Sequence, residues 1–369
     1  MTVRVLHVLE ALEGGTARHL VDVVRHARSV VHEVVLPPSR VGGITDPAAT
    51  DRLRAAGATI HLLPMRRTPW SPRNGESLAR LARLVRARRP DVVHGHSSIG
   101  GLLARLGAVG TGRPCLYTPN GITQVRAGVV VERRLRRFTH RFVAVSASEG
   151  ELAVELGLIG SDRLVVIPNG IELEAPPPVP LRARLGIDAG VPLVGTIARL
   201  VPQKAPEDFV AACALVGAAL PDAHFVLIGG GELQAQVDAA LQASGLGARF
   251  HQLESLPGAA GALGEFDVFT LSSRFEGGPY APLEAMRART AVVLTDCVGS
   301  RDAVEHGTSG LLVPVGDPAA LATAVVELLC AAERRRQLAA AGRARVEERF
   351  TVELMGARLD ELYTTVAGR

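Results

Sequence analysis

Short apolar runs rich in Val, Leu and Ile alternate along the chain with longer stretches in which apolar and charged residues recur at helical spacing. In the first half, this pattern predicts strands at Val3–Leu9, Glu33–Leu36, Thr59–Leu63, Val92–His94, Leu116–Thr118, Phe142–Val145 and Val165–Ile167. Arg- and Ala-rich helices such as Ser77–Arg88 lie between several of these strands. Near-continuous apolar strands separated by helices are typical of a parallel sheet that is covered on both faces.

Residues 174–180, with the sequence EAPPPVP, interrupt this pattern, because proline lacks the amide donor that an interior strand or helix needs. We interpret the segment as a stiff linker at a domain boundary. The pattern then restarts and predicts strands at Leu193–Ile197, Phe225–Ile228, Phe250–Leu253, Val268–Leu271, Val292–Thr295 and Leu311–Val313. Two predicted helices, Ala331–Val346 and Val352–Thr365, follow the last strand.

The predicted fold class is therefore α/β, with two doubly wound, Rossmann-like parallel-sheet domains. We assign residues 1–173 to an N-terminal domain and residues 181–350 to a C-terminal domain. Residues 351–369 are expected to form a helix that packs back on the N-terminal domain. Ligands of such sheets bind beyond the carboxyl ends of the strands, so functional residues are expected in the loops that follow the strands.

Composition narrows the class of protein. A chain of 369 residues with 47% hydrophobic and 21% charged residues is globular and long enough for two domains. Aromatic residues make up only 4%, which argues against the stacking platforms of nucleic-acid-binding proteins. No apolar stretch approaches the roughly 20 residues of a membrane span, and the N-terminus resembles a first strand rather than a cleavable leader, so we expect a cytoplasmic protein. The four cysteines are far apart, which predicts neither disulfides nor a metal cluster.

Charge is distributed unevenly. Residues 1–175 hold 24 Arg, no Lys and 15 acidic residues, a net charge of +9, whereas the remainder holds 16 Arg, one Lys and 22 acidic residues, a net charge of −5. The near absence of lysine indicates the coding bias of a high-GC bacterium rather than a nucleic-acid role. The basic half either meets an anionic acceptor or membrane surface, or carries ordinary solvated helix faces.

The only lysine, Lys204, lies in the string IARLVPQK directly after a predicted strand. It follows Arg199 by five residues, so both cations can converge on one dianionic group through charge-assisted hydrogen bonds. An ordinary solvated loop is the alternative interpretation. Because lysine is kept here and nowhere else in the chain, we favour phosphate binding.

Three consecutive glycines, at positions 229–231, follow the strand at Phe225–Ile228 and precede a helix. Glycine permits close backbone approach, and the amides of a helix N-terminus bind anions. Glycine-rich turns of this kind also occur for packing alone. No G-x-G-x-x-G string follows the first strand, so a dinucleotide-binding domain is not indicated there.

The strongest pattern is SSRFEGGPYAPLEAM, residues 272–286. It places Glu276 and Glu284 eight residues apart around a Gly-Gly-Pro turn that leads into a helix. One carboxylate can accept hydrogen bonds from sugar hydroxyls at the loop, and the other from a ribose diol beside the helix. Backbone amides between Gly277 and Ala281, apart from Pro279, remain for phosphates or sugar.

Together these features resemble the retaining glycosyltransferases of family four, which have the GT-B fold of two facing Rossmann-like domains. The matching strings are the Gly-Gly pair at 14–15, IPNG at 167–170, ARLVPQK at 198–204, the motif from Glu276 to Glu284 with its LEAM, and GLLVPVGDP at 310–318. They occur in the family's order and extend from about residue 3 to residue 350. In VVIPNGIEL, the Pro-Asn-Gly turn is interpreted as an interdomain hinge.

The resemblance implies that Arg199 and Lys204 hold the donor diphosphate and act in catalysis with Glu276, which contacts the donor hexose. Glu284 would hold the ribose hydroxyls. The rest of the donor site would comprise loop residues that follow other strands, namely Gly230, Leu253, Gly277, Gly278, Pro279, Tyr280 and Ala281. On the acceptor side the resemblance implies Gly15, His94 and Asn120, although a core or capping role for His94 and His96 is equally open.

The chain departs from the family at Ala17, where many relatives have glutamate, and at Asn120, where many have histidine in T-P-H-G. These changes bear on sugar specificity. No D-x-D string occurs, and the nearest string, Glu265-Phe266-Asp267, runs into a predicted core strand. We therefore expect no metal and no cofactor, with Arg199 and Lys204 replacing the metal electrostatically.

The sequence thus predicts a retaining, metal-independent transfer of a hexosyl unit from a nucleotide sugar, such as UDP-GlcNAc or UDP-glucose, to a hydroxyl of a small-molecule, natural-product or glycan- or lipid-linked acceptor. No nucleic-acid partner is expected, weak association with anionic membranes stays open, and the oligomeric state is undetermined. The alternatives are a nucleotide-sugar epimerase of the same fold and a nucleotide-sugar-binding protein without turnover.

Overall fold

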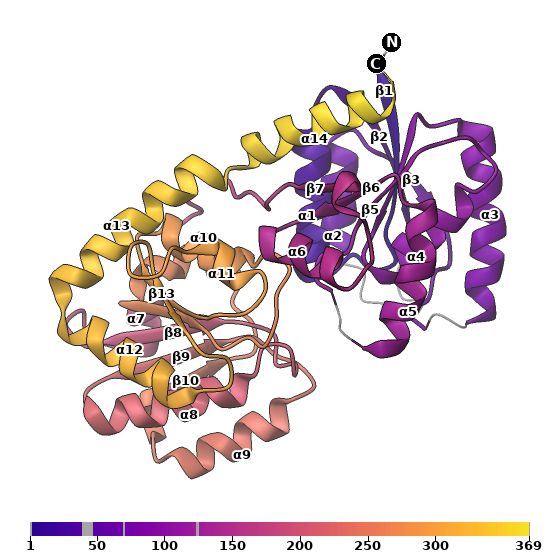
Figure 1. The fold of residues 1–369 in the computed structure, drawn as a ribbon. Helices are drawn as coiled ribbons and strands as arrows, with labels where there is room; N and C mark the ends of the chain where they lie inside the picture. The colour runs from indigo at the N-terminus through magenta and orange to yellow at the C-terminus, as the bar shows by residue number, and fades with distance from the viewer. Residues whose placement is uncertain (1, 39–46, 69–70, 123–124, 369) are drawn as a thin grey trace. The chain divides into compact units, whose positions relative to one another are not determined.

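The computed structural model describes residues 2–38, 47–68, 71–122 and 125–368. The chain divides into two compact units, each an α/β layer structure with helices on both faces of a parallel sheet (Figure 1). Unit 1 comprises residues 1–170 and 352–369, and unit 2 comprises residues 171–351. The boundary between the units therefore falls just before the proline-rich segment 174–180. This segment belongs to unit 2, and its Val179 amide donates to the Gly261 carbonyl at 3.1 Å.

Unit 1 holds a seven-stranded parallel sheet with the strand order β3-β2-β1-β4-β5-β6-β7. Its strands are β1 (Val3–Val8), β2 (Val30–Leu36), β3 (Thr59–Leu62), β4 (Val92–His96), β5 (Cys115–Thr118), β6 (Arg141–Ala144) and β7 (Leu164–Val166). Its helices are α1 (Gly14–His26), α2 (Pro47–Ala55), α3 (Pro72–Arg88), α4 (Ser98–Gly107), α5 (Arg126–Leu135), α6 (Ala147–Glu155) and α14 (Val352–Val366).

Unit 2 holds a six-stranded parallel sheet with the strand order β10-β9-β8-β11-β12-β13. Its strands are β8 (Leu193–Ile197), β9 (His224–Ile228), β10 (Phe250–Leu253), β11 (Val268–Leu271), β12 (Ala291–Thr295) and β13 (Leu311–Val313). Its helices are α7 (Leu181–Leu185), α8 (Pro206–Ala219), α9 (Gln234–Ser244), α10 (Tyr280–Arg287), α11 (Ser300–Ala303), α12 (Pro318–Cys330) and α13 (Ala332–Arg349).

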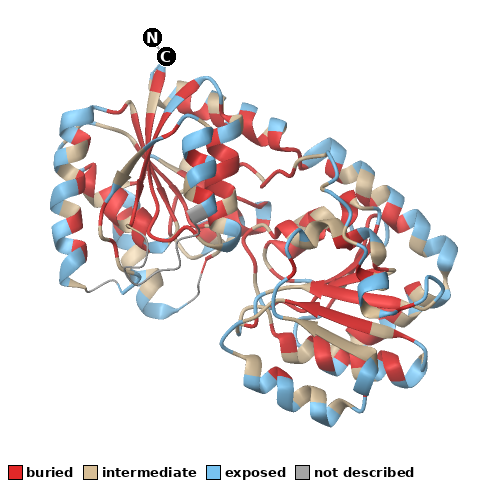
Figure 2. Ribbon diagram, turned by 180° about the vertical axis from the view of Figure 1, so that it is seen from behind, coloured by how far each residue is buried: buried red, intermediate tan, exposed pale blue. Residues whose placement is uncertain are grey.

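The predicted fold class is confirmed, since every strand range expected from the sequence overlaps an observed strand of a parallel sheet. The inner strands are buried on both faces, as the red ribbons of Figure 2 show, which explains why they appear in the sequence as unbroken apolar runs. The edge strands β3, β7 and β10 are only partly buried. In the described residues, no helix is long and apolar enough to cross a membrane.

Helix α14, although last in the chain, packs against α1 of unit 1. The backbone amide and hydroxyl of Ser29 donate to the Asp360 carboxylate, the hydroxyl at 2.9 Å. Gly356 permits the close approach, because a Cβ atom there would lie 2.4 Å from the His26 carbonyl oxygen. The buried Tyr363 hydroxyl reaches His94 Nδ1 at 2.8 Å.

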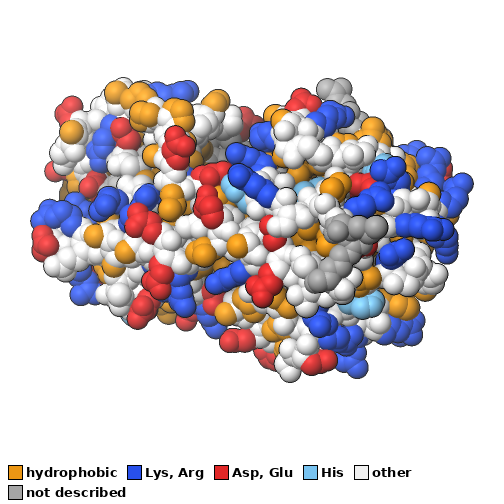
Figure 3. Space-filling view, turned by 90° about the horizontal axis from the view of Figure 1, so that it is seen from above, with side chains coloured by type: hydrophobic (Ala, Val, Ile, Leu, Met, Phe, Trp, Pro, Cys, Tyr) orange, Lys and Arg blue, Asp and Glu red, His pale blue; other side chains and the backbone are white. Residues whose placement is uncertain are grey.

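The charge asymmetry of the sequence is visible on the surface. In Figure 3, Lys and Arg side chains gather over unit 1, at the right of the view, whereas the surface of unit 2 mixes both signs. The surface of unit 1 therefore carries the larger excess of positive charge.

Candidate functional site

The sheet of unit 2 reverses its direction of growth at one point. The chain runs outward from β8 through β9 to β10 and then returns to the other side of β8 with β11. Because all strands are parallel, the loops that follow β8, β9, β10 and β11 lie at one edge, and ligands of such sheets bind at a switch point like the one between β8 and β11. The predicted donor-site residues are in these loops.

Lys204 and Glu276 meet at this switch point. Lys204 Nζ lies 2.5 Å from Glu276 Oε1, although the residues are 72 positions apart. Both side chains are largely buried, with 16% of the lysine and 5% of the glutamate exposed. The sequence assigned the lysine to phosphate and the glutamate to sugar; the structure additionally pairs them with each other.

Two residues that the sequence did not single out complete this pair. The Ser273 hydroxyl donates to Glu276 Oε1 at 2.6 Å. Gln203 Nε2 donates to the Phe275 carbonyl at 3.0 Å and lies 3.5 Å from Glu276 Oε2, which is a weak contact. Ser273 lies three residues before Glu276, and Gln203 adjoins Lys204, so their sequence positions were the only available signal.

The pair keeps binding capacity for a ligand. An ammonium group has three donors, and one of them serves Glu276. A carboxylate oxygen accepts two hydrogen bonds, so Glu276 Oε1 is saturated by the lysine and the serine, whereas Oε2 is nearly unoccupied. One side of the pair can thus bind an anion while the other accepts a hydroxyl.

Arg199 follows β8 with an exposed side chain that has no hydrogen-bond or ion-pair partner in the described part of the chain. The glycines at 229–231 pack directly against its loop. A Cβ atom on Gly229 would lie 2.0 Å from the Ala198 carbonyl oxygen, and one on Gly231 would lie 2.4 Å from that of Leu200. Close backbone packing therefore explains these two glycines, while Gly230, which follows the same strand end, faces Glu254.

Leu253 ends β10, and its carbonyl accepts a hydrogen bond from the Gly229 amide at 2.8 Å. The loop predicted to meet the base thus begins beside the glycine turn. This contact places Leu253 and Gly230 at the same edge of the sheet.

The loop after β11 leads into α10. Gly277, Pro279 and Tyr280 are buried, whereas Gly278 and Ala281 are partly exposed. Helix α10 begins at Tyr280, and Pro279 before it makes no side-chain capping hydrogen bond. Glu284 lies in this helix, partly exposed.

Glycine 299 holds this loop in place. It has a φ of +82°, and a Cβ atom there would lie 2.5 Å from the Gly277 carbonyl oxygen. The Glu276 amide donates to the Val298 carbonyl at 2.9 Å. The end of the Glu276 loop is therefore fixed by the segment that follows β12.

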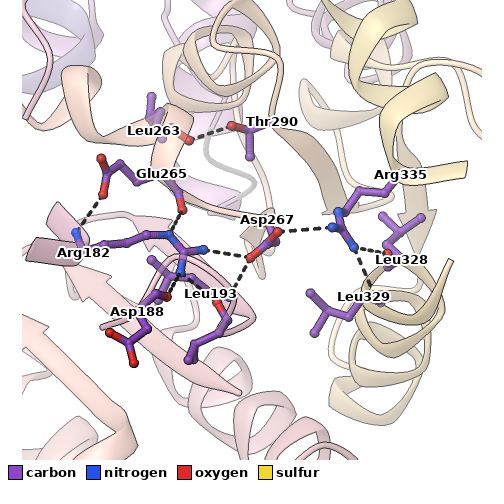
Figure 4. A network of polar contacts seen from close by, with 11 residues as sticks. Arg182, Asp188, Leu193, Leu263, Glu265, Asp267, Thr290, Leu328, Leu329 and Arg335 are labelled. Carbon is purple, nitrogen blue, oxygen red and sulfur yellow. Dashed lines mark hydrogen bonds and ion pairs between the residues drawn. The ribbon is translucent and has the colours of Figure 1, made fainter. Parts of the chain in front are cut away.

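The Glu265-Phe266-Asp267 string lies at the opposite, amino-terminal edge of the sheet, where Asp267 directly precedes β11 (Figure 4). The Asp267 carboxylate accepts from Arg182 Nη2 at 2.9 Å and lies 3.3 Å from Arg335 Nη2. Glu265 accepts from the Arg182 amide at 2.7 Å. The Asp267 carboxylate thus binds two arginines and the Leu193 amide, and the Glu265 carboxylate binds a backbone amide, which are structural roles.

Unit 1 has its own switch point, between β1 and β4. Gly15 lies there, exposed in the first turn of α1 after β1. Glu10, which the sequence did not single out, accepts from the Ser97 hydroxyl at 2.8 Å and from the Gly100 amide at 2.9 Å. The carboxylate therefore neutralises the N-terminal end of α4.

Asn120 lies in the turn after β5 in the left-handed region, with a φ of +57°. Glu149 fixes this turn, because its carboxylate accepts from the Gly121 amide at 2.6 Å and from the Val145 amide at 2.8 Å. The Asn120 Nδ2 atom is buried and has no partner in the part of the chain that the structure describes. It is thus a hydrogen-bond donor available to a ligand.

His94 is fully buried, with Nδ1 bonded to the Tyr363 hydroxyl and Nε2 to the Thr118 hydroxyl at 2.9 Å. Of the two alternatives for His94, the structure therefore shows a core position. Four further buried histidines lie around it: His7, His19, His32 and His96.

The hydrogen bonds within this histidine cluster determine the tautomers. His32 Nε2 donates to the Ala27 carbonyl at 2.7 Å, so its Nδ1 accepts from His7 Nε2 at 2.9 Å. His7 Nδ1 then accepts from His96 Nε2 at 3.0 Å. His96 Nδ1 is left as a lone pair without a partner among the described residues.

The cluster is neutral at ordinary pH. Burial lowers the pKa of His94 to about 3 and that of His19 to about 4, although a hydrogen bond to Asn169 opposes the second shift. Burial likewise takes the pKa of His7 and His96 well below 6.5, helped by the neighbouring imidazoles. Among the described residues, His7, His94 and His96 form the one group of possible metal ligands, and it lies in unit 1.

Comparison with known proteins identifies both units. Residues 14–170 match the family model "Glycosyl transferase 4-like domain", and residues 191–331 match "Glycosyl transferases group 1". The first match covers most of unit 1 and the second most of unit 2.

Among curated relatives, a 2-deoxystreptamine N-acetyl-D-glucosaminyltransferase of Streptomyces fradiae is 30% identical over 79% of this chain and 75% of its own. A UDP-Gal:alpha-D-GlcNAc-diphosphoundecaprenol alpha-1,3-galactosyltransferase of Escherichia coli is 28% identical over 69% of this chain and 70% of its own. The fold matches Anabaena HepE in complex with UDP and glucose, with a TM-score of 0.84, 19% identity, and coverage of 98% of this chain and 100% of that one.

Proposed function

The chain belongs to the group 1 glycosyltransferases of family four, which have the GT-B fold, and from this premise we propose that it is a retaining, metal-independent hexosyltransferase. It transfers a sugar from a nucleotide sugar to an acceptor. The observation that carries the finer proposal is the contact between Lys204 and Glu276 at the switch point between β8 and β11. A cation and a carboxylate with spare binding capacity stand there side by side.

The donor is proposed to be a UDP-hexose such as UDP-glucose or UDP-GlcNAc. Support comes from the galactosyltransferase relative, whose name specifies UDP-Gal, and from the HepE structure, which contains UDP and glucose. In this chain, Arg199 and Lys204 bind the diphosphate, Glu284 the ribose, and Glu276 the hexose. Gly230 and Leu253 approach the nucleotide from the neighbouring strand ends.

Charge development during the reaction explains the choice of residues. The bond between the anomeric carbon and the diphosphate oxygen breaks, and negative charge grows on the leaving group. Fixed cations at Arg199 and Lys204 stabilise that charge most in the transition state, which accelerates the reaction. The acceptor oxygen bonds to the same face of the sugar, and the departing phosphate oxygen takes its proton.

Metal independence is supported by the environment of the acidic residues. On the far edge of the sheet, the Asp267 carboxylate binds the Arg182 side chain and the Glu265 carboxylate binds the Arg182 backbone amide. Among the described residues of unit 2, no three His, Cys, Asp or Glu side chains lie close enough together to form a metal site by themselves.

Unit 1 is proposed to bind the acceptor. Asn120 presents an unpartnered amide donor after β5, and Gly15 leaves an open backbone after β1. The acceptor class includes small molecules, natural products and glycan- or lipid-linked hydroxyl compounds.

The test is incubation of the protein with UDP-glucose and with UDP-GlcNAc in the absence of an acceptor. A transferase releases free sugar slowly by donor hydrolysis, an epimerase interconverts the donors, and a binding protein does neither. The Lys204→Ala variant serves as the control for contaminating activity. Donor interconversion without free sugar would overturn the proposal.

A further inference from the structure

Unit 1 contains a cavity of about 260 Å³ between α4 and α5, beyond the carboxyl end of β5. Its walls are formed mainly by apolar side chains, among them Ile99, Leu102, Tyr117, Ile122, Val131 and Phe142. The rings of Tyr117 and Phe142 meet edge to face, 5.5 Å apart, and make a rigid floor. A cavity of this size is somewhat smaller than a typical small-molecule site, so it holds part of a ligand.

The cavity presents no uncompensated charge. Glu132 is the one charged side chain among the described lining residues, and buried Arg105 binds it through two hydrogen bonds of 2.6 and 2.9 Å. The Arg105 guanidinium also stacks 3.9 Å from the centre of the Tyr117 ring and donates to the Gly101 carbonyl. With this pair satisfied, an apolar group is the occupant that the cavity accepts without a desolvation penalty.

Helix α5 carries the opposite chemistry on its outer face. Ala127, Gly128, Val131 and Glu132 line the cavity, and helical geometry directs a second set of residues away from it. That outward set is exposed and consists of Arg126, Val130, Arg133 and Arg134. Arg133 donates to the Leu156 carbonyl at 2.6 Å, so Arg126 and Arg134 are the cations that remain for an anionic group.

We propose that this cavity receives the hydrocarbon chain of a lipid-linked acceptor, whose anionic group lies toward the arginines of α5. The inference rests on the proposed function and specifies its acceptor class. Asn120, with its unpartnered amide donor, lies between Pro119 and Gly121, which line the cavity. The acceptor's polar part and its hydrocarbon chain thus find adjacent sites in one unit.

The experiment is calorimetric titration of the full chain with geranyl phosphate, with geraniol and inorganic phosphate as separate arms. Val131→Trp fills the cavity, and Ala127→Phe, at an exposed lining position, narrows it with little risk to folding. Both variants are expected to lose at least tenfold in affinity for geranyl phosphate. The matched control is Val130→Trp, one residue away on the outer face, with an expected change below twofold.

A second pair of variants addresses the charge. Arg126→Gln combined with Arg134→Gln is expected to weaken geranyl phosphate severalfold and to leave geraniol binding unchanged. If the protein binds geranyl phosphate and geraniol with equal affinity, and the double arginine variant binds both like the parent, the proposal is wrong. The cavity would then bind an uncharged aglycone. Binding that survives both cavity variants, or no binding at all, would overturn the proposal as well.

Titration with UDP separates this inference from the proposed function. The cavity variants, the Val130→Trp control and the double arginine variant are expected to bind UDP as tightly as the parent protein, because the donor residues belong to unit 2. Intact UDP binding with no geranyl phosphate binding refutes the lipid acceptor alone. Loss of UDP binding in the parent protein would instead refute the proposed glycosyl transfer.

Discussion

Replacing Lys204 with alanine tests the donor site most directly, because it has two separable consequences. The first is chemical: losing one fixed cation at the leaving group is expected to lower turnover about 100-fold, or about 2.7 kcal/mol. The second is structural. Glu276, whose side chain is only 5% exposed, loses its ion-pair partner and keeps Ser273 as its main hydrogen-bond donor.

Removing one partner of a buried ion pair lowers the free energy of unfolding by about 3 kcal/mol or more. Because Ser273 still donates to Glu276, we expect the smallest of these losses, about 3 kcal/mol. For a domain the size of unit 2, about 180 residues, each kcal/mol lowers Tm by about 2–4 °C. Lys204→Ala is therefore expected to lower the Tm of unit 2 by about 6–12 °C. Differential scanning calorimetry measures this shift, and release of free sugar from UDP-glucose measures turnover.

The combination of Lys204→Ala with Glu276→Gln distinguishes the two effects. Neutralising the stranded carboxylate is expected to recover most of the lost stability, whereas the missing cation still prevents stabilisation of the leaving group. Arg336→Ala is the control, since its pair with Glu333 is exposed and contributes at most about 1 kcal/mol. If the double variant regains activity together with stability, Lys204 has only a structural role and the reasoning is wrong.

Three other outcomes are expected. Glu284→Ala should weaken UDP binding more than Glu276→Ala does, while Glu276→Ala should lower turnover more than affinity; calorimetry showing the reverse order would contradict the assignment of ribose and sugar. Excess EDTA should leave activity nearly intact, and complete loss restored by manganese or magnesium would contradict the cation-pair mechanism. In the folded protein the pKa values of His19 and His94 lie below 6.5, so as the pH falls the unfolded chain takes up protons at these histidines before the folded chain does. Unit 1 should therefore lose stability as the pH falls below about 6.5. Each histidine contributes about 2 kcal/mol of loss at pH 5, and equal Tm values for unit 1 at pH 7.5 and pH 5 would refute this.

The local pattern of the sequence determined the elements of the fold. Apolar β-branched runs predicted each strand, for example Val268–Leu271, because a strand buried on both faces needs apolar residues at consecutive positions. The site loops were also predictable, since Arg199, Lys204 and Glu276 lie in loops that follow strands and parallel strands end at one edge. The family strings added the assignment of these loops to a nucleotide sugar.

Only the tertiary structure decided which side chains meet. The return of β11 to the side of β8 brings Glu276 to Lys204 across 72 residues, and it gives Ser273 and Gln203 roles that no spacing indicates. The histidine cluster likewise collects residues from three strands and one helix, and α14 reaches His94 through Tyr363 from the far end of the chain. Such contacts depend on strand order and on packing between distant segments, whereas the periodicity of a sequence reports only the surroundings of each segment.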